Sequence, residues 1–285
     1  MVKEISKTQI DRLGERLKKG KIEEADLRML DQYRRSFTPA YEIVVKAIRE
    51  QLSLEPTGRP AKSTPSIVDK LKRESIRLTQ IQDIGGCRLI AVDIADQEQV
   101  ILTLKKLFEN ITIADRRENP SHGYRAVHVI VRCQEKLIEI QIRTALQHLW
   151  AELSEKYSDV LDPAIKYGGG DEKIRAFLTE TTSSLIGLEG LESELRLIKM
   201  ELPSIEETDI RANPDMYEKL ITSISGLEEN LQYSKQGLFK VLETRTNTIE
   251  RIKLLRNKID IAKSDLFKSE LKELLFTVDK KMFPK

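Results

Sequence analysis

The spacing of apolar residues divides the chain into three parts. From about residue 5 to residue 53, apolar residues recur at the spacing of amphipathic helices, with a break near residues 19–21 and a linker at 54–58. Helical and strand-like patterns alternate from residue 65 to residue 157, and a glycine-rich joint follows at 167–170. We therefore predict N-terminal helices over 1–55 that pack on a central domain, the central domain over 56–167, and a helical C-terminal extension over 168–285.

The central part combines both patterns. Helical spacing covers residues 65–75, 97–109 and 145–157, whereas short β-branched runs cover 87–93, 111–115, 125–133 and 137–143. Three residues separate the last two runs, as in an antiparallel hairpin. These elements predict the α/β class in its α+β form, with a mixed β-sheet flanked by helices.

The C-terminal extension is predicted to be helical over residues 172–200, to turn in the proline-containing region 203–214, and to end in one or two long helices. A mostly apolar heptad frame runs through Ile224, Leu227, Leu231, Ser234, Leu238, Val241, Arg245, Thr248, Ile252, Leu255, Ile259, Ala262 and Leu266. Such a frame fits a coiled coil between chains and also a helical hairpin packed on the chain itself. We expect the extension to set an oligomeric state or to bind a partner that restrains activity.

A basic helix start lies near residue 64. Pro65 suits the first turn of a helix, and Thr64 is a candidate cap. The residues on one helical face, together with a lysine just upstream, are Lys62, Ser66, Lys70 and Arg73. A cationic face at a helix N-terminus suits a polyphosphate. The alternative is the solvated basic face of an ordinary helix.

Two carboxylates are predicted at strands of the same domain. Asp83 precedes a buried apolar strand, and the glycine pair at 85–86 lets a ligand or another backbone approach closely. In the strand at 137–143, Glu139, Gln141 and Arg143 alternate with isoleucines, so this polar row is either the wet side of a sheet or part of a site. Two carboxylates beside a polyphosphate imply Mg²⁺, which proteins hold through one or two acids and substrate phosphates.

The order of these motifs resembles the synthetase domain of RelA/SpoT-type alarmone synthetases. The chain has K-x-x-x-S-x-x-x-K-x-x-R from Lys62, D-I-x-G-x-R from Asp83, G-Y-R-x-x-H from Gly123 and E-I-Q-I-R-T from Glu139, followed by W-A-E. The resemblance implies a nucleotidyltransferase-like domain that transfers the β,γ-pyrophosphate of ATP to the ribose 3′-hydroxyl of GDP or GTP and releases AMP. Because the chain has no His-Asp dipeptide, the resemblance implies the small synthetase type without a hydrolase half.

The resemblance also implies roles for the donor residues. Arg88 would stack on adenine, and Arg59 would lie on the other face of the ring, although it stands three residues before the lysine where two is usual. The ATP phosphates would be held by Lys62, Ser66, Lys70 and Arg73.

Metal and acceptor residues carry over in the same way. Asp83 and Glu139 would bind Mg²⁺, and Glu139 would take the proton from the attacking hydroxyl. Tyr124 would stack on the acceptor base, on the same face of an extended strand as His128. The acceptor pocket would be lined by His128, Gln141 and Arg143. From the residues alone, Tyr124 also fits a half-buried core tyrosine, and His128 a structural histidine.

The sequence leaves the identity of the acceptor undecided. The loop at 115–122 is shorter than is usual in synthetases that make guanosine alarmones, and it lacks their Pro-Lys pair. Some small members of the family instead modify the 3′ end of tRNA, for which Arg116, Arg117 and the run at 33–35 would supply phosphate contacts, unless they are ordinary surface charge. A third alternative is a non-catalytic nucleotide sensor or scaffold.

Composition narrows the choice further. The chain has 285 residues, a net charge of +2 and 33% charged residues of both signs, so it lacks the global positive charge of a dedicated nucleic-acid binder. Cys87 and Cys133 fall in predicted strands, as buried thiols rather than a disulfide framework. No apolar run approaches the length of a membrane span, so we expect no membrane partner and a cytoplasmic protein.

Overall fold

The computed structural model describes residues 5–20, 22–208 and 214–259, and its contacts divide the chain into two units. The first unit comprises Met1–Val92, Asp96–Glu118 and Ala126–Arg143, and the second comprises Asp93–Ala95, Asn119–Arg125 and Thr144–Lys285. The helices up to the sheet's last strand are α1 (Lys7–Lys19), α2 (Glu24–Arg35), α3 (Thr38–Leu52), α4 (Thr64–Arg73), η1 (Leu78–Gln80) and α5 (Ile94–Leu107).

A five-stranded mixed sheet is the centre of the first unit. Its strands are β1 (Thr57–Arg59), β2 (Gly85–Ala91), β3 (Ile111–Asp115), β4 (Val127–Cys133) and β5 (Lys136–Thr144), in the order β1-β2-β5-β4-β3. β1 pairs antiparallel with β2, and β3, β4 and β5 form an antiparallel meander. The mixed sheet and the hairpin are confirmed, whereas β1 lies partly in the predicted linker and was missed because it is only three residues long.

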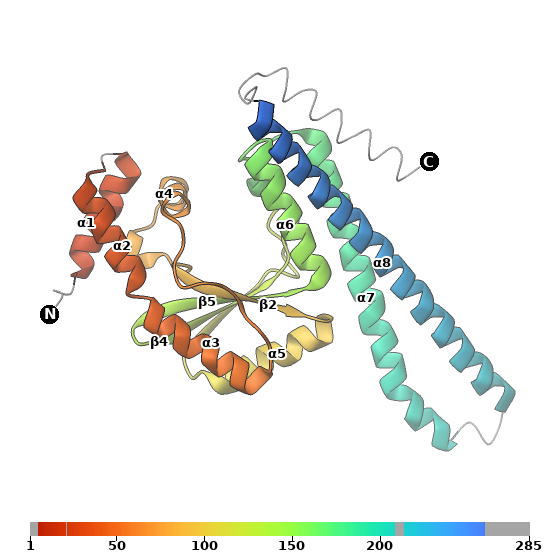
Figure 1. The fold of residues 1–285 in the computed structure, drawn as a ribbon. Coiled ribbons are helices and arrows are strands. Elements are labelled where there is room, and N and C mark those ends of the chain that lie inside the picture. Colours follow the sequence, from red (N-terminus) through yellow and green to blue (C-terminus); the bar gives the residue numbers. More distant parts are fainter. Residues whose placement is uncertain (1–4, 21, 209–213, 260–285) are drawn as a thin grey trace. The chain divides into compact units, whose positions relative to one another are not determined.

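The sheet has one apolar face. Its central strands contribute Cys87, Leu89, Ala91, Val127, Val129, Val131, Ile138, Ile140 and Ile142, all at most 4% exposed. Helix α3 contacts β2 and β4, and Val100, Ile101 and Leu104 of α5 join the same core. Figure 1 shows both helices below the sheet and α4 above it. Because strand side chains alternate between faces, residues such as His128 and Glu139 are directed to the opposite side.

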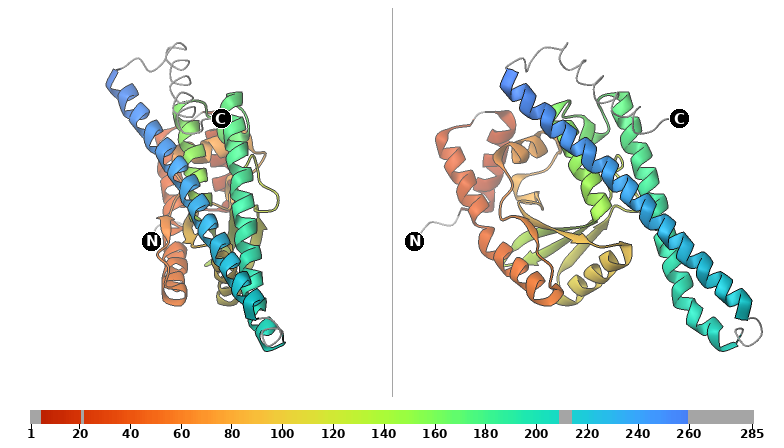
Figure 2. Two further views of the ribbon diagram at one scale, coloured as in Figure 1. Left: turned by 90° about the vertical axis from the view of Figure 1, so that its right-hand side faces the viewer. Right: turned by 45° about the vertical axis from the view of Figure 1, so that its right-hand side comes forward.

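Three helices form the core of the second unit. They are α6 (Ala145–Val160), α7 (Glu172–Thr208) and α8 (Pro214–Ile259), with the short helix η2 (Ile165–Tyr167) between α6 and α7. Figure 2 shows α7 and α8 side by side as a long hairpin, and α8 also contacts α6. Apolar residues of α6 such as Trp150 and Leu153 pack with Leu178, Leu242 and Ile249. The described part of the extension is therefore a hairpin packed on its own chain.

The predicted heptad frame holds at most of the positions whose side chains the structure describes. Ile224, Leu231, Leu238, Arg245 and Ile252 are buried or half-buried, as the frame requires. Val241 and Thr248 are also half-buried, whereas Leu227 and Ser234 are exposed and the residues that follow them, at 228 and 235, are half-buried instead. Glu228 and Lys235 hide the true pattern because both are charged, yet they pair with Lys199 and Glu192 of α7. The frame's side chains from Leu255 onward lie outside the described residues.

Two further boundaries differ from the prediction. Helix α7 runs to Thr208, through the proline that was expected to end it, and α8 begins at Pro214. Strand β4 begins at Val127, so Tyr124 precedes the strand and does not share its face with His128. Tyr124 instead forms an isolated bridge with Ser121 in a turn where His122 and Gly123 have positive φ. Local turn geometry here overrides the extended pattern.

Two further expectations from the sequence concern the cysteines and membrane-spanning segments. Cys87 is buried and Cys133 half-buried, and both are free thiols. Within the described ranges, no helix combines the length and the apolar character needed to cross a membrane.

A buried arginine joins α8 to α6 in the second unit. Arg245 Nη1 donates to Tyr157 Oη at 2.6 Å, and the Arg245 guanidinium lies 3.5 Å from the centre of the Phe177 ring. Burial lowers the pKa of Arg245, while its hydrogen bond to Tyr157 raises it. The hydroxyl of Tyr157 thus compensates a desolvated cation.

We predict that Tyr157→Phe lowers the free energy of unfolding by about 1.5–3 kcal/mol, because a buried cation loses a hydrogen-bond acceptor. Chemical denaturation followed by circular dichroism measures the change. Tyr233→Phe, at a residue that is 78% exposed, is the matched control and should change stability little. Equal effects of the two substitutions would contradict the assigned role of Tyr157.

Candidate active site

Two lysines converge on one carboxylate beside the start of β2. Lys62 Nζ lies 2.6 Å from Asp83 Oδ2, and Lys70 Nζ lies 3.0 Å from Asp83 Oδ1. The three side chains are only 18–22% exposed. Lys62 comes from the loop before α4, Lys70 from α4 itself and Asp83 from the residue pair before β2. The predicted donor lysines and the predicted metal ligand therefore lie together.

Local chemistry fixes this arrangement. Ser63 caps α4 by accepting from the Ser66 backbone N–H at 3.4 Å, so the predicted cap at Thr64 is one residue too late. The Lys62 N–H donates to the Ile84 carbonyl at 2.6 Å, which ties the loop to the beginning of β2. Burial raises the pKa of Asp83, but Lys62 and Lys70 outweigh it and hold that pKa below its usual value. Asp83 is therefore ionised at neutral pH.

A second cluster lies on the polar face of the sheet. Glu139 of β5 contacts His128 of β4, with Glu139 Oε1 and His128 Nδ1 2.8 Å apart. Gln141 Nε2 donates to Glu139 Oε2 at 2.8 Å, and Arg143 Nη2 donates to Gln141 Oε1 at 2.8 Å. The register pairs His128 with Gln141 across the two strands. All four residues predicted on this part of the site thus form one hydrogen-bonded row, in which Arg143 is almost fully buried.

The Glu139 carboxylate is held in its charged form. Burial raises its pKa, His128 and Gln141 lower it through their hydrogen bonds, and the nearby charge of Asp83 raises it; the net pKa lies below the usual value. The pKa of Cys87 on the opposite face is raised to about 12, by burial and by the charge of Glu139. Repulsion between Asp83 and Glu139 shows that the two carboxylates share one electrostatic environment.

Gly86 allows β2 to approach β5 at this point. A Cβ at Gly86 would lie 2.8 Å from the Glu139 carbonyl oxygen and 3.4 Å from Glu139 Cβ. The neighbouring Gly85 is similarly close to Pro60 and Ile138. The glycine pair is therefore required for the close approach of backbones that its sequence predicted.

The remaining donor residues are more dispersed. Ser66 lies one turn before Lys70 on α4 and accepts from the Ser63 hydroxyl at 2.8 Å. Arg73, at the last turn of α4, pairs with the adjacent Glu74 at 2.9 Å. Arg88 is half-buried on β2, on the same side of that strand as Gly86. Arg59 ends β1, and its side chain lies outside the described part of the structure.

The sequence did not predict that Arg34 contributes to the structure of this site. Arg34 of α2 donates from Nε to the Lys62 carbonyl at 2.7 Å and also lies 3.9 Å from Asp31. Arg34 was considered as a contact for tRNA phosphate, but the structure gives it an internal role in holding the Lys62 loop. Its distance of 28 residues from Lys62 left no local signal in the sequence.

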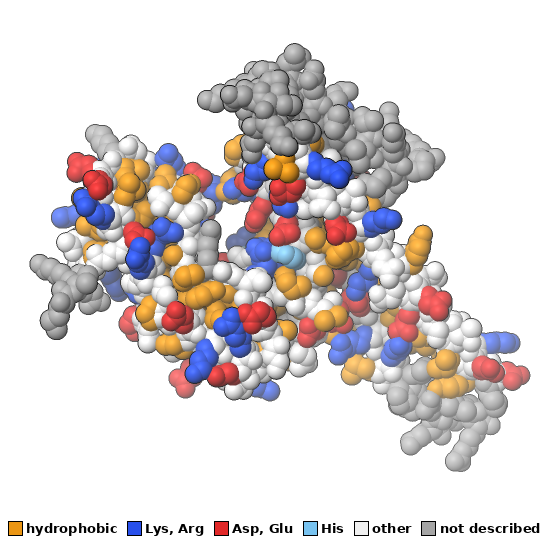
Figure 3. Space-filling model, in the orientation of Figure 1, with side chains coloured by type: hydrophobic (Ala, Val, Ile, Leu, Met, Phe, Trp, Pro, Cys, Tyr) orange, Lys and Arg blue, Asp and Glu red, His pale blue; other side chains and the backbone are white. Residues whose placement is uncertain are grey.

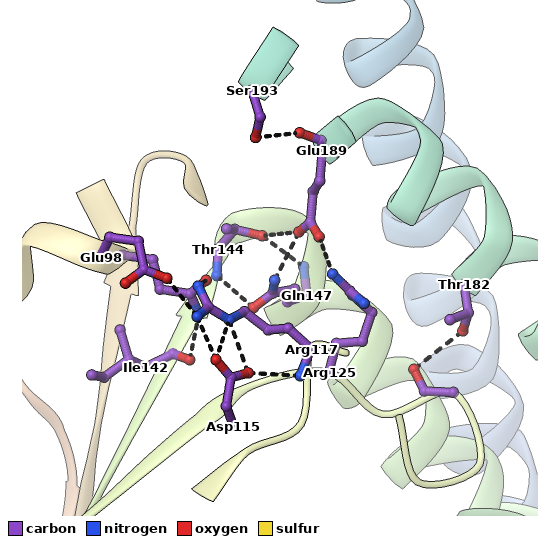
Figure 4. A network of polar contacts seen from close by, with 12 residues as sticks. Glu98, Asp115, Arg117, Arg125, Ile142, Thr144, Gln147, Thr182, Glu189 and Ser193 are labelled. Atoms are coloured by element: carbon purple, nitrogen blue, oxygen red, sulfur yellow. Dashed lines mark hydrogen bonds and ion pairs between the residues drawn. The ribbon is translucent and has the colours of Figure 1, made fainter. Parts of the chain in front are cut away.

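A second candidate nucleic-acid contact, Arg117, is also engaged internally, whereas Arg116 is exposed. Arg117 forms ion pairs with Asp115 and Glu98, both at 2.5 Å, and donates to Gln97 at 3.2 Å (Figure 4). Burial lowers the pKa of Arg117, but the two carboxylates raise it by more, so the net pKa lies above its usual value. On the face shown in Figure 3, basic side chains are interspersed with acidic ones over the described surface. The charge of Arg117 is thus compensated within the protein.

The donor set suits a hard cation. The described residues contain no group of three or more His, Cys, Asp and Glu side chains that could hold a metal ion alone. Asp83 and Glu139 supply two ionised carboxylates, which is the usual protein share of a Mg²⁺ site completed by substrate phosphates. These residues fit the predicted metal, and they lie beside cations suited to phosphate.

The polar side of the mixed sheet thus carries two ionised carboxylates, and a lysine pair converges on one of them. Residues 58–158 match the model of the family described as "Region found in RelA / SpoT proteins". The chain therefore contains a RelA/SpoT region, and the family resemblance of its motifs is confirmed.

Relatives share this region. An uncharacterized protein of Mycobacterium tuberculosis is 38% identical over 120 residues, which cover 41% of this chain and 44% of that protein. A probable chloroplastic GTP diphosphokinase of rice (Oryza sativa subsp. japonica) is 30% identical over 112 residues, or 38% of this chain and 16% of that protein. The matches thus span less than half the length of these curated relatives.

Solved structures align over more of the chain. The small alarmone synthetase 1 from Bacillus subtilis is 25% identical with a TM-score of 0.48, and it covers 60% of this chain and 99% of that chain. A GTP pyrophosphokinase family protein from Streptococcus pneumoniae is 25% identical with the same TM-score, and it covers 63% of this chain and 97% of that chain.

We predict that Gly86→Ala destabilises the protein by about 1–3 kcal/mol, because the new methyl group must displace the Glu139 backbone or separate β2 from β5. Thermal and chemical denaturation measure the change. The matched control is Gly226→Ala in α8, where no atom lies within 4 Å of an added Cβ. That substitution should stabilise by about 0.5–1 kcal/mol, since alanine is the better helix former. A neutral Gly86→Ala variant would refute the close approach.

Proposed function

We propose that this protein is a pyrophosphokinase that transfers the β,γ-pyrophosphate of ATP to the ribose 3′-hydroxyl of GDP or GTP, producing a (p)ppGpp-type alarmone and AMP. The observation that carries the proposal is the convergence of Lys62, Lys70 and Asp83 beside the Glu139 row, within a RelA/SpoT region. The relative named as a probable GTP diphosphokinase supports the same chemistry.

The geometry of α4 and β2 supports the donor roles that the family resemblance implies. Lys62 and Lys70 lie where they would exchange Asp83 for phosphate oxygens, and Ser66 and Arg73 extend the same helix face. The positive end of the α4 dipole adds a favourable field for the anion. Arg88 would stack on adenine from β2, with Arg59 from β1 on the other side of the ring. In this type of transfer, positioning and charge neutralisation contribute most of the catalysis.

Glu139 is the group best placed to accept a proton. Its carboxylate is ionised, half-buried and oriented by His128 and Gln141, so it is held ready to take the proton of a ribose hydroxyl. Asp83 and Glu139 would hold Mg²⁺, which neutralises charge on the transferred group. Gln141 and Arg143 would act on the acceptor side, Arg143 through Gln141 because its own guanidinium is buried. Tyr124 would stack on the acceptor base.

The contacts of the candidate basic residues favour a guanine nucleotide over tRNA as the acceptor. A tRNA acceptor would need local phosphate contacts, but Arg34 and Arg117 are both engaged inside the protein. A non-catalytic sensor is disfavoured because Asp83 and Glu139 are both present and ionised.

The test is to incubate the purified protein with Mg²⁺ and ATP labelled in the γ-phosphate, offering GDP, GTP or deacylated tRNA in separate reactions. We expect label in a guanosine product with release of AMP, and none on the tRNA. Label on the tRNA alone would replace the guanine nucleotide by the RNA acceptor. Absence of transfer to every acceptor would overturn the enzymatic function.

We predict that Asp83→Ala and Glu139→Ala each abolish pyrophosphate transfer while weakening ATP binding only in part, since the lysines and α4 remain. Transfer assays and equilibrium binding of a non-hydrolysable ATP analogue measure the two effects. The control is Asp115→Ala, at a carboxylate paired with Arg117 that has no assigned role in the reaction. Full activity in both test variants would show that the metal assignment is wrong.

A further inference from the structure

The segment that carries Tyr124 packs against the C-terminal helices within the second unit. The hydroxyl of Thr182 on α7 is shared between the Leu178 carbonyl of its own helix, at 2.9 Å, and the Gly123 carbonyl, at 3.2 Å. Two helical turns further along the same face of α7, Glu189 Oε2 lies 2.7 Å from Arg125 Nη2. Side chains of α7 therefore hold the residue before Tyr124 and the residue after it (Figure 4).

The contact to Arg125 belongs to a buried polar network. The side chains of Arg125 and Glu189 are only 10% and 8% exposed. The other oxygen of Glu189 accepts from Gln147 Nε2 at 2.7 Å and from Thr144 Oγ1 at 3.3 Å. Thr144 caps α6 and is the last residue of β5, the strand that carries Glu139. A buried ion pair of this kind is sensitive to the loss of either partner.

Burial raises the pKa of Glu189, against the lowering effects of Arg125, Gln147 and Thr144. The charged form of this carboxylate is therefore stabilised by hydrogen bonds from its partners and not by solvent. Its burial is costly for stability, and that cost is consistent with a role beyond simple packing.

Close packing restricts the segment still further. Gly123 has a φ of 87°, and a Cβ there would lie 2.6 Å from Thr182 Oγ1 and 2.7 Å from Trp150 Cζ2. Tyr124 itself is half-buried against the apolar cluster of α6, α7 and α8. The orientation of Tyr124 is thus fixed by residues of the C-terminal helices.

We propose that Glu189 is a positioning residue for the acceptor: through Arg125 it fixes the segment 123–125 and so the ring of Tyr124. This inference rests on the function proposed above, because it takes the acceptor-stacking role of Tyr124 from there. It assigns to the helical extension a role in substrate affinity.

The test compares Glu189→Gln with Glu192→Gln. Glu192 lies three residues further along α7 and pairs with Lys235 of α8, with side chains 19% and 22% exposed, so its substitution also removes an ion pair of the hairpin. We expect Glu189→Gln to raise the KM for the guanine nucleotide at least about tenfold, as expected when part of a buried ion pair's energy is lost from the acceptor complex. The KM for ATP should stay within about twofold. Glu192→Gln should leave both constants unchanged.

A second readout is independent of activity. Trp150 is the only tryptophan of the chain and packs beside Gly123. We expect Glu189→Gln to increase quenching of Trp150 fluorescence by acrylamide, and Glu192→Gln to leave it unchanged. If Glu189→Gln fails to fold by circular dichroism, the double variant Arg125→Met with Glu189→Met removes both charges without leaving an unpaired charge and should show the same rise in acceptor KM.

The outcomes separate the two proposals. An active protein whose acceptor KM is unaffected in the Glu189→Gln or double variant overturns the positioning role, as does an equal rise in both KM values, which would indicate general loosening of the fold. A native protein that transfers pyrophosphate to no acceptor overturns the proposed function and with it the acceptor role of Glu189. In that case, unchanged Trp150 quenching would also show that Glu189 does not hold the segment.

Discussion

The close approach of β2 to β5 at Gly86 is the constraint on which the site depends. Because no side chain separates the two backbones, Asp83, two residues before β2, and Glu139 of β5 enter the same electrostatic environment. Asp83 then repels Glu139, and each carboxylate needs its own compensation. Lys62 and Lys70 supply it for the first, and His128 with Gln141 for the second.

The opposite face of the sheet makes this concentration of charge possible. The isoleucines of β5 and the valines of β4 are fully buried against α3 and α5, so the strands are anchored by apolar packing. A one-residue slip would exchange the two faces and place Glu139 in the core, which makes the register strongly specified. The same alternation therefore secures the fold and presents the polar row.

The sequence predicted best what local pattern determines. The alternation in β5, the cationic face of α4 and the hairpin could all be derived from spacing, and each is present in the structure. Positions fixed by contacts distant in sequence could not be derived. Arg34 reaches Lys62 across 28 residues, and Tyr124 lies in a turn held by α7, about 60 residues further along the chain. In α8, charged residues at two inward positions, Glu228 and Lys235, depart from the apolar frame because their partners lie on another helix.

Charge balance at Asp83 links the observed geometry to the proposed reaction. In the structure, two ammonium groups compensate one carboxylate that is 18% exposed. Phosphate oxygens that accepted hydrogen bonds from Lys62 and Lys70 would draw that compensation away and leave Asp83 ionised in a poorly solvated place. A divalent cation brought with the nucleotide would restore the balance, because the freed carboxylate and the phosphates would attract it together. The ion pairs of Lys62 and Lys70 with Asp83 thus keep its carboxylate charged. We therefore expect the nucleotide and the metal to bind cooperatively.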